Sequence, residues 1–93
     1  MSDDCLFCKI IAGELPSNKV YEDDDVFAFE DINPNAPVHV LVVPKKHISD
    51  MLAATPEDET LLGRLLLRAN DIARTLGVDK TGFRYVLNTG EDS

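Results

Sequence analysis

The chain has 93 residues, enough for one small domain with a thin hydrophobic core. Its net charge of −8 argues against a general nucleic-acid binder, because such a protein needs a basic face to displace counterions. No apolar run reaches the ~18 residues of a membrane span, and the acidic start, MSDD, does not resemble a secretory signal. We therefore expect a cytoplasmic protein with neither a nucleic-acid nor a membrane partner.

The first half of the chain predicts a short helix followed by strands. Residues 5–12 form the helix, which Asp3 or Asp4 caps and Gly13 ends. Three runs rich in β-branched and aromatic residues predict strands: residues 19–22, 26–29 and 38–43. Residues 31–37 hold two prolines and two asparagines, so we expect a loop there.

The second half predicts one long helix and a last strand. Thr55 is a natural N-cap, Pro56 suits the first helical position, and Gly77 ends the helix. An apolar stripe at helical spacing predicts its buried face: Leu62, Leu65, Leu66, Ala69, Ile72, Ala73 and Leu76. Leu67 lies off this stripe and is either an ordinary exposed leucine or part of a second buried face, as in a dimer. Residues 83–87 alternate as a strand does.

This order of elements predicts an α+β fold with a mainly antiparallel sheet, one long helix and one short helix. The sheet is one strand short, because the turn at residues 88–90 has no segment to lead to before Ser93. We expect the exposed sheet edge to leave the isolated chain unstable or domain-swapped. We therefore expect the 93 residues to be a truncated form of a longer enzyme rather than a naturally short protein.

The two cysteines form a Cys-x-x-Cys pair at the start of the first helix. Cys5 and Cys8 face the same way and can hold one metal ion; without a secretory signal we expect no structural disulfide. His47, in a loop, can join them as a third ligand, with no clear fourth. The competing interpretation is two small buried thiols and a surface histidine. A thioredoxin-type redox pair fits less well, because no strand precedes the motif.

Each remaining polar candidate leaves two interpretations open. His39, inside an apolar strand, is a hydrogen-bonded core histidine or a catalytic group. Asp31 caps the loop amides or accepts both hydroxyls of a ribose. The turn at residues 88–90 is only a turn or cradles an oxyanion. Lys45 and Lys46 are interpreted as a solvated pair.

Four runs of sequence together resemble the histidine triad (HIT) family, and within it the histidine triad nucleotide-binding proteins. They are CLFCKIIAGELP at residues 5–16, VYED at 20–23, AFEDINP at 28–34 and HVLVVPKKHI at 39–48. The runs follow one another in order over nearly the whole chain. The resemblance implies a homodimer that binds purine nucleoside monophosphates and hydrolyses adenosine phosphoramidates through a nucleotidyl-histidine intermediate.

The resemblance also implies roles for single residues. Five apolar side chains would line the base pocket: Leu6, Phe7, Ile10, Phe29 and Ile32. Asp31 would hold the ribose hydroxyls, Asn88 would touch the phosphate, and His39 would be a supporting active-site histidine. Three residues match the zinc ligands of the zinc-carrying members: Cys5, Cys8 and His47.

The chain departs from the family pattern at one point. The His-x-His-x-His run that names the family supplies the nucleophile and the fourth zinc ligand, whereas the histidines here are His39 and His47 alone. We therefore expect residues 1–93 to be a single HIT domain, C-terminally incomplete, without its last catalytic strand and inactive as it stands. The alternatives are a non-catalytic module that binds a nucleotide or dimerises, and a zinc-clipped interaction protein.

Overall fold

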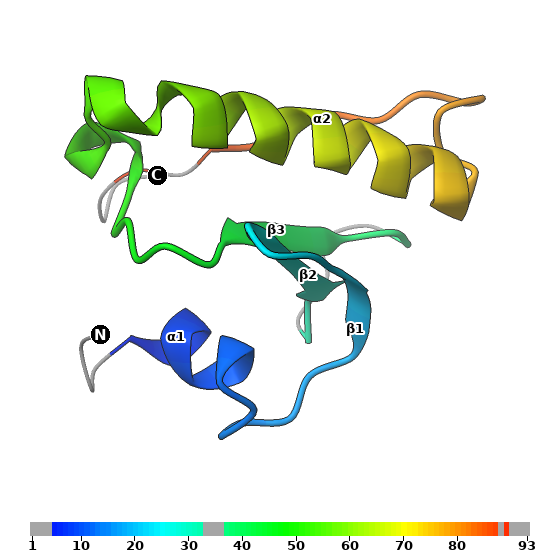
Figure 1. Cartoon of the computed structure of the whole chain (residues 1–93). Coiled ribbons are helices and arrows are strands. Elements are labelled where there is room, and N and C mark those ends of the chain that lie inside the picture. The colour runs from blue at the N-terminus through cyan, green and yellow to red at the C-terminus, as the bar shows by residue number, and fades with distance from the viewer. Residues whose placement is uncertain (1–4, 33–36, 88, 90–93) are drawn as a thin grey trace. The chain divides into compact units, whose positions relative to one another are not determined.

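A computed structural model describes three stretches of the chain: residues 5–32, residues 37–87 and residue 89 (Figure 1). The chain divides into two compact units, Met1–His47 and Ile48–Ser93. None of the helices within the described stretches is long and apolar enough to cross a lipid bilayer. Three sequence predictions fall wholly or partly outside the described part: the cap at Asp3 or Asp4, the loop at residues 33–36, and the turn at Asn88 and Gly90.

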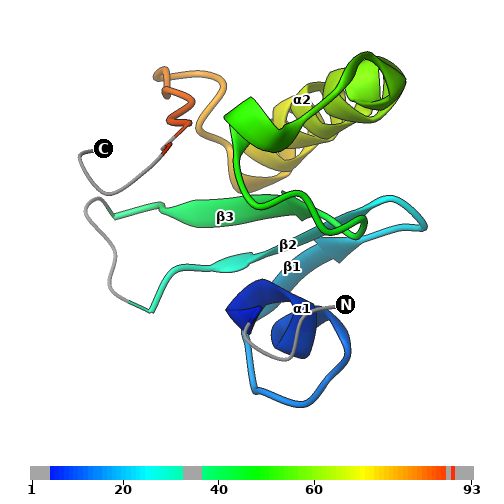
Figure 2. The same ribbon diagram turned by 90° about the vertical axis from the view of Figure 1, so that its left-hand side faces the viewer.

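The first unit is built on an antiparallel sheet of three strands in the order β1-β2-β3. The strands are β1 (Lys19–Glu22), β2 (Val26–Glu30) and β3 (Val40–Pro44). The short helix α1 (Leu6–Ile11) lies against one face of this sheet (Figure 2). The central strand β2 forms the core, because its residues from Val26 to Phe29 are all buried.

The hairpin between β1 and β2 is closed by one aspartate. Asp23 Oδ1 accepts hydrogen bonds from the backbone N–H groups of Asp25 and Val26, both at 2.8 Å. Its Oδ2 accepts from the Tyr21 hydroxyl at 2.7 Å. These contacts explain the acidic turn, since aspartate side chains satisfy turn amides that no strand partner can reach.

Helix α1 confirms the predicted helix, but its cap differs from the prediction. Cys5, rather than Asp3 or Asp4, is the N-cap residue, and its Sγ accepts a hydrogen bond from the Cys8 N–H at 3.1 Å. The reason is spacing: an N-cap side chain reaches the amide three residues later, and Cys5 stands at that distance from Cys8. Gly13, with φ of 81°, follows the helix as expected.

Strand β3 is shifted from the predicted residues 38–43. It begins at Val40 and includes Pro44, which pairs with Val26. A proline at the end of a strand is tolerated because its missing N–H costs no ladder hydrogen bond there. His39 therefore stands directly before the strand, and its carbonyl still accepts a hydrogen bond from the Asp31 N–H at 3.0 Å.

In the second unit, the long helix α2 (Glu59–Leu76) follows two 3₁₀ turns, η1 (Met51–Ala53) and η2 (Pro56–Asp58). The predicted start is confirmed: Thr55 is the N-cap of η2, and the Asp58 carboxylate accepts its backbone N–H at 3.0 Å. The predicted end is confirmed as well, since Gly77 adopts a left-handed φ of 78°.

The predicted buried stripe of α2 is only partly correct. Ile72 and Ala73 are buried, whereas Leu66 and Leu76 are 46% and 39% exposed. Leu67, off the stripe, is 59% exposed. The buried face is thus narrower than the sequence pattern, because helical spacing shows which residues share a face and not how much of that face is covered.

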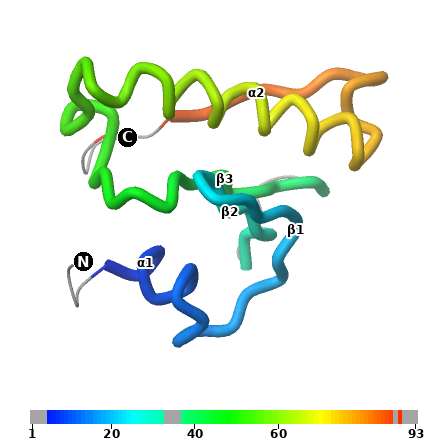
Figure 3. The backbone as a smooth tube through the Cα atoms, viewed as in Figure 1, coloured from blue at the N-terminus to red at the C-terminus, as the bar shows by residue number. Residues whose placement is uncertain are grey.

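The predicted strand at residues 83–87 is wrong. Within the described stretches these residues form no ladder with any strand; they turn back and run beside α2 (Figure 3). Tyr85 donates a hydrogen bond to Asn70 Oδ1 of α2. Phe83 and Tyr85 do face one way, with ring centroids 5.2 Å apart. The side chains alternate as predicted, but a strand also needs a partner to pair with. The predicted α+β class is confirmed, with three strands in the part of the chain that the structure describes.

Candidate functional site

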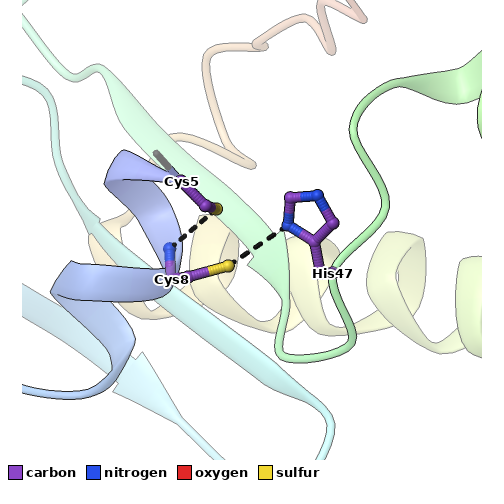
Figure 4. Close-up of side chains that lie close together, drawn as sticks. All are labelled: Cys5, Cys8 and His47. Atoms are coloured by element: carbon purple, nitrogen blue, oxygen red, sulfur yellow. Dashed lines mark hydrogen bonds between the residues drawn. The ribbon is translucent and has the colours of Figure 1, made fainter. Parts of the chain in front are cut away.

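Two thiols and one imidazole meet in the first unit. Cys5 and Cys8 come from the start of α1, and His47 comes from the loop after β3 (Figure 4). Their Sγ and ring-nitrogen atoms all lie within 4.8 Å of one another, and the Cys8 Sγ is 3.2 Å from the His47 Nδ1. Neither cysteine is in a disulfide in this structure. The structure therefore brings together the three residues that were predicted from the sequence as a set of metal ligands.

The two thiols differ in acidity. Hydrogen bonding to the Cys8 side chain lowers the pKa of the Cys5 thiol, and the Cys8 backbone N–H lowers it further. The same hydrogen bond, together with burial, raises the pKa of the Cys8 thiol. Cys8 is only 4% exposed, so an unpaired thiolate there would be poorly solvated. In the metal-free chain we therefore expect the Cys5 thiol to ionise before the Cys8 thiol.

The donor set fits a tetrahedral metal ion. Zinc bonds of ~2.3 Å to sulfur and ~2.0 Å to nitrogen place a sulfur and a nitrogen ligand ~3.5 Å apart. The 3.2 Å between Cys8 Sγ and His47 Nδ1 is close to that spacing. Within the described ranges, no further histidine, cysteine or carboxylate joins the cluster. Two thiolates and one imidazole are ligands that zinc favours over hard cations such as magnesium.

A second group of candidates lies on the face of the sheet that α1 covers. Phe7 of α1 packs on Phe29 of β2, with ring centroids 6.0 Å apart. Because side chains two apart on a strand share a face, Asp31 follows Phe29 on this same side. Alternation therefore places the Asp31 position on the face of β2 that carries the aromatic pair.

Asp31, directly after β2, and His39, directly before β3, face each other where the β2–β3 pairing begins. The β2–β3 register pairs Glu30 with Val40, and the Asp31 N–H to His39 carbonyl bond continues it by one step. The His39 Nε2 lies 3.5 Å from the Asp31 Oδ2. The His39 side chain is 29% exposed, so it is not the enclosed core histidine that was one interpretation. The sequence alone did not indicate that Asp31 and His39 form a pair, because their contact depends on the β2–β3 register.

The other predicted pocket residues are less clearly assembled. Ile32 is 85% exposed and Leu6 is 57% exposed, while Ile10 is half-buried. Asn88 lies outside the described residues, so its predicted contact with a phosphate stays a prediction. Of the proposed base pocket, the structure brings together Phe7 and Phe29.

The interpretation of Lys45 as part of a solvated lysine pair is wrong. Its Nζ lies 2.8 Å from the Glu22 Oε2, and Lys19 approaches the other oxygen of the same carboxylate at 3.1 Å. Hydrogen bonds from Lys45 and then Lys19 hold the pKa of Glu22 below its usual range. The pairing arises because β1 and β3 flank β2, a neighbourhood that the sequence does not display.

Comparisons with known proteins agree with this architecture. Residues 4–91 match the family described as "Scavenger mRNA decapping enzyme C-term binding". An uncharacterized HIT-like protein from Synechocystis is 52% identical over 92 residues, which span 99% of this chain and 80% of that protein. The purine nucleoside phosphoramidase of Escherichia coli is 42% identical over 89 residues, 96% of this chain and 75% of that protein.

A solved structure gives the same result. A histidine triad protein from Clostridium difficile matches with a TM-score of 0.94 and 48% identity, over 99% of this chain and 80% of that one. The antiparallel sheet, the two helices and the order of the elements are thus those of a histidine triad fold. This chain belongs to the histidine triad (HIT) family.

Proposed function

We propose that these residues bind a purine nucleoside monophosphate, as the nucleotide-holding part of a HIT-family hydrolase of the phosphoramidase type. The observation that carries the proposal is the packing of Phe7 on Phe29, because Asp31 follows two positions after Phe29 and strand alternation puts it on the same face. An aromatic pair offers an apolar face for a base, and an adjacent carboxylate accepts hydrogen bonds from ribose hydroxyls. The similarity to the Escherichia coli purine nucleoside phosphoramidase supports the substrate class.

The proposal separates binding from turnover. In the HIT-type reaction an imidazole nitrogen attacks phosphorus, the amine leaves with a proton, and water then releases the nucleoside monophosphate. Of the two histidines in the 93 residues, His47 faces a thiol and His39 faces a carboxylate. Neither has the role of nucleophile in the family resemblance. We propose that the 93-residue chain binds the nucleotide and does not cleave a phosphoramidate.

A paired measurement tests binding and turnover on the same sample. Titration with AMP, followed by the aromatic proton resonances of Phe7 and Phe29, is expected to show saturable binding. Adenosine 5′-phosphoramidate incubated with the chain is expected to release no ammonia above the uncatalysed rate. Absence of AMP binding would refute the nucleotide proposal, and turnover that disappears in His39→Ala would refute the proposal of inactivity.

We propose zinc as the resident metal of Cys5, Cys8 and His47. Bound zinc would hold both sulfurs as thiolates and tie α1 to the loop after β3, a structural role with no part in the chemistry. Protein purified without chelators is expected to contain about one zinc ion per chain by elemental analysis. A zinc content near zero, with both thiols reduced, would refute the assignment. Reduced thiols also agree with a cytoplasmic location, which we infer.

A dimerising role has its own supporting observation. Large apolar side chains of the second unit are exposed in the single chain: Leu66, Leu67, Phe83, Val86 and Leu87. Surfaces of this kind are often covered by a partner, and a second copy of the chain is the partner we propose. Sedimentation velocity is expected to show a dimer that Leu67→Glu weakens and the control Leu52→Glu, also at an exposed leucine, does not. Equal behaviour of both variants would exclude α2 from the interface.

A further inference from the structure

The end of the β2–β3 hairpin joins a carboxylate and an imidazole by backbone geometry. The Asp31 N–H donates to the His39 carbonyl at 3.0 Å, so the two residues are directly opposite in the antiparallel register. Opposite residues project from the same face of a sheet. Their side chains consequently meet, with Nε2 of His39 3.5 Å from Oδ2 of Asp31. The neighbouring acid Glu30 projects from the other face.

The chemistry of the contact restricts the imidazole. An ionised carboxylate only accepts hydrogen bonds, so the ring nitrogen that faces it is favourable only when it carries a proton. A neutral His39 is then protonated on Nε2, and its Nδ1 is left as the acceptor. Each oxygen of a carboxylate can accept more than one hydrogen bond, so Asp31 can accept a ribose hydroxyl while Oδ2 keeps its place beside the ring.

We propose that Asp31 is a positioning residue for His39: it holds the imidazole as the Nε2–H tautomer and links the state of this ring to occupation of the ribose site. The inference rests on the proposed nucleotide binding and extends it. One carboxylate then serves two partners, a ribose hydroxyl and an imidazole. Binding of the sugar changes the electron density that His39 experiences, without direct contact between nucleotide and ring.

A second aspartate, Asp23 in the turn before β2, gives a contrast. Asp23 receives two backbone amides and the Tyr21 hydroxyl, all within 2.8 Å. Those donors fix a turn, and none of them changes its protonation near neutral pH. The partner of Asp31 is instead a side chain with two neutral tautomers. The two aspartates on either side of β2, Asp23 and Asp31, therefore differ in the kind of group that they contact.

The first arm of the test reads the tautomer directly. Ring ¹⁵N shifts are recorded at about pH 8, well above the ordinary imidazole pKa of ~6.5, and His39→Gln assigns the signals. The wild-type chain is expected to show His39 almost entirely as Nε2–H. In Asp31→Ala the shifts are expected to move to those of a free peptide with the sequence of residues 37–41. Asp31→Asn, which keeps an acceptor oxygen, is expected to restore the tautomer, and the charge-matched Asp24→Ala to leave it unchanged.

The second arm compares AMP with 2′,3′-dideoxyadenosine monophosphate at saturation. Both nucleotides are expected to shift the Phe7 and Phe29 resonances, with the dideoxy compound binding about tenfold more weakly or worse. Only AMP is expected to shift the His39 nitrogens.

The outcomes are distinct. An Nδ1–H ring in the wild type, or an unchanged ring in Asp31→Ala, overturns the positioning role whether or not AMP binds. Equal His39 shifts with both nucleotides overturn the link and leave nucleotide binding intact. No response of the aromatic resonances to AMP overturns the proposed function, and this inference with it.

Discussion

The two histidines of the first compact unit meet different partner atoms. His47 turns its Nδ1 toward the Cys8 sulfur at 3.2 Å, in a loop that follows a strand. His39 turns its Nε2 toward the Asp31 carboxylate at 3.5 Å, at the position just before the same strand. The sequence presents both as lone histidines flanking one apolar run, and nothing in residue type separates them.

The difference teaches that the partner decides the chemistry of an imidazole. A soft sulfur partner favours a shared metal ion, for which the histidine must be neutral. A carboxylate partner favours a bound proton and a fixed tautomer. Strand β3 thus lies between the cluster of Cys5, Cys8 and His47, which we propose as a zinc site, and the contact of Asp31 with His39.

The largest expected effect is on zinc binding by the cluster that contains His47. Cys8→Ser and His47→Ala are each expected to weaken zinc binding by about 100-fold or more, because a site with three protein ligands loses much of its affinity when one of them is removed. Competition with a chromophoric chelator measures the affinity. His39→Ala is the matched control and is expected to keep the wild-type affinity. A similar loss in His39→Ala would show that the two histidines are not functionally distinct.

The next largest effect is on AMP binding by Asp31, the partner of His39. Asp31→Ala is expected to weaken AMP binding by about 10- to 100-fold, because hydrogen bonds to a charged acceptor are lost. Isothermal titration calorimetry measures the change. Asp24→Ala, on the exposed acidic turn, makes the same change in net charge and is expected to bind as the wild type does. Equal losses in both variants would point to long-range electrostatics instead of a ribose contact.

A smaller effect distinguishes the two sulfurs. In metal-free protein, iodoacetamide is expected to alkylate Cys5 about fivefold or more faster than Cys8, because the thiolate is the nucleophile and only Cys5 has a lowered pKa. Timed quenching and peptide mass spectrometry give both rates. Zinc is expected to protect the two residues together. Faster reaction at Cys8 would contradict the assignment of the proton to that sulfur.

The smallest expected effect comes from the surface ion pair of Glu22 with Lys45, and it serves as a reference for the effects at the other two sites. Lys45 and Lys19 lower the pKa of Glu22, so the pair stabilises the fold above the ordinary glutamate pKa of ~4.3. That stabilisation is lost as the pH falls through the lower pKa of the folded state. Carboxyl ¹³C titration of Lys45→Ala is expected to show the Glu22 midpoint rising, and Lys46→Ala to leave it in place. An unchanged midpoint in Lys45→Ala would exclude the pairing in solution.

Local signals predicted the elements well where their causes are local. Helix α2 begins after Thr55 and ends at Gly77 as expected, because a cap and a left-handed glycine act on the residues beside them. The β1–β2 hairpin was equally readable, since its turn aspartate bonds to amides two and three residues on. The Cys-x-x-Cys spacing likewise put two ligands on one side of α1.

The failures have a common physical cause, which is pairing between distant residues. Residues 83–87 alternate correctly, yet within the described stretches they find no strand partner. The contact of Asp31 with His39 depends on a register that begins at Val26 and Pro44. Alternation predicts the face of the sheet on which a residue lies but not the residue that pairs with it on the next strand. A shift of one residue in the β2–β3 register would have separated Asp31 from His39.

The closure of the β1–β2 turn by Asp23 has a consequence for the order of folding. Contacts between residues so near in sequence form early, and hairpins close in ~1–10 μs. Strand β3 must then add across the longer loop that links it to β2, and loop closure costs more entropy as the loop grows. The hairpin contacts do not depend on β3, whereas the contact of Asp31 with His39 forms only when β3 has paired with β2. We therefore expect a longer loop between Asp31 and His39 to slow formation of that contact more than formation of the β1–β2 hairpin.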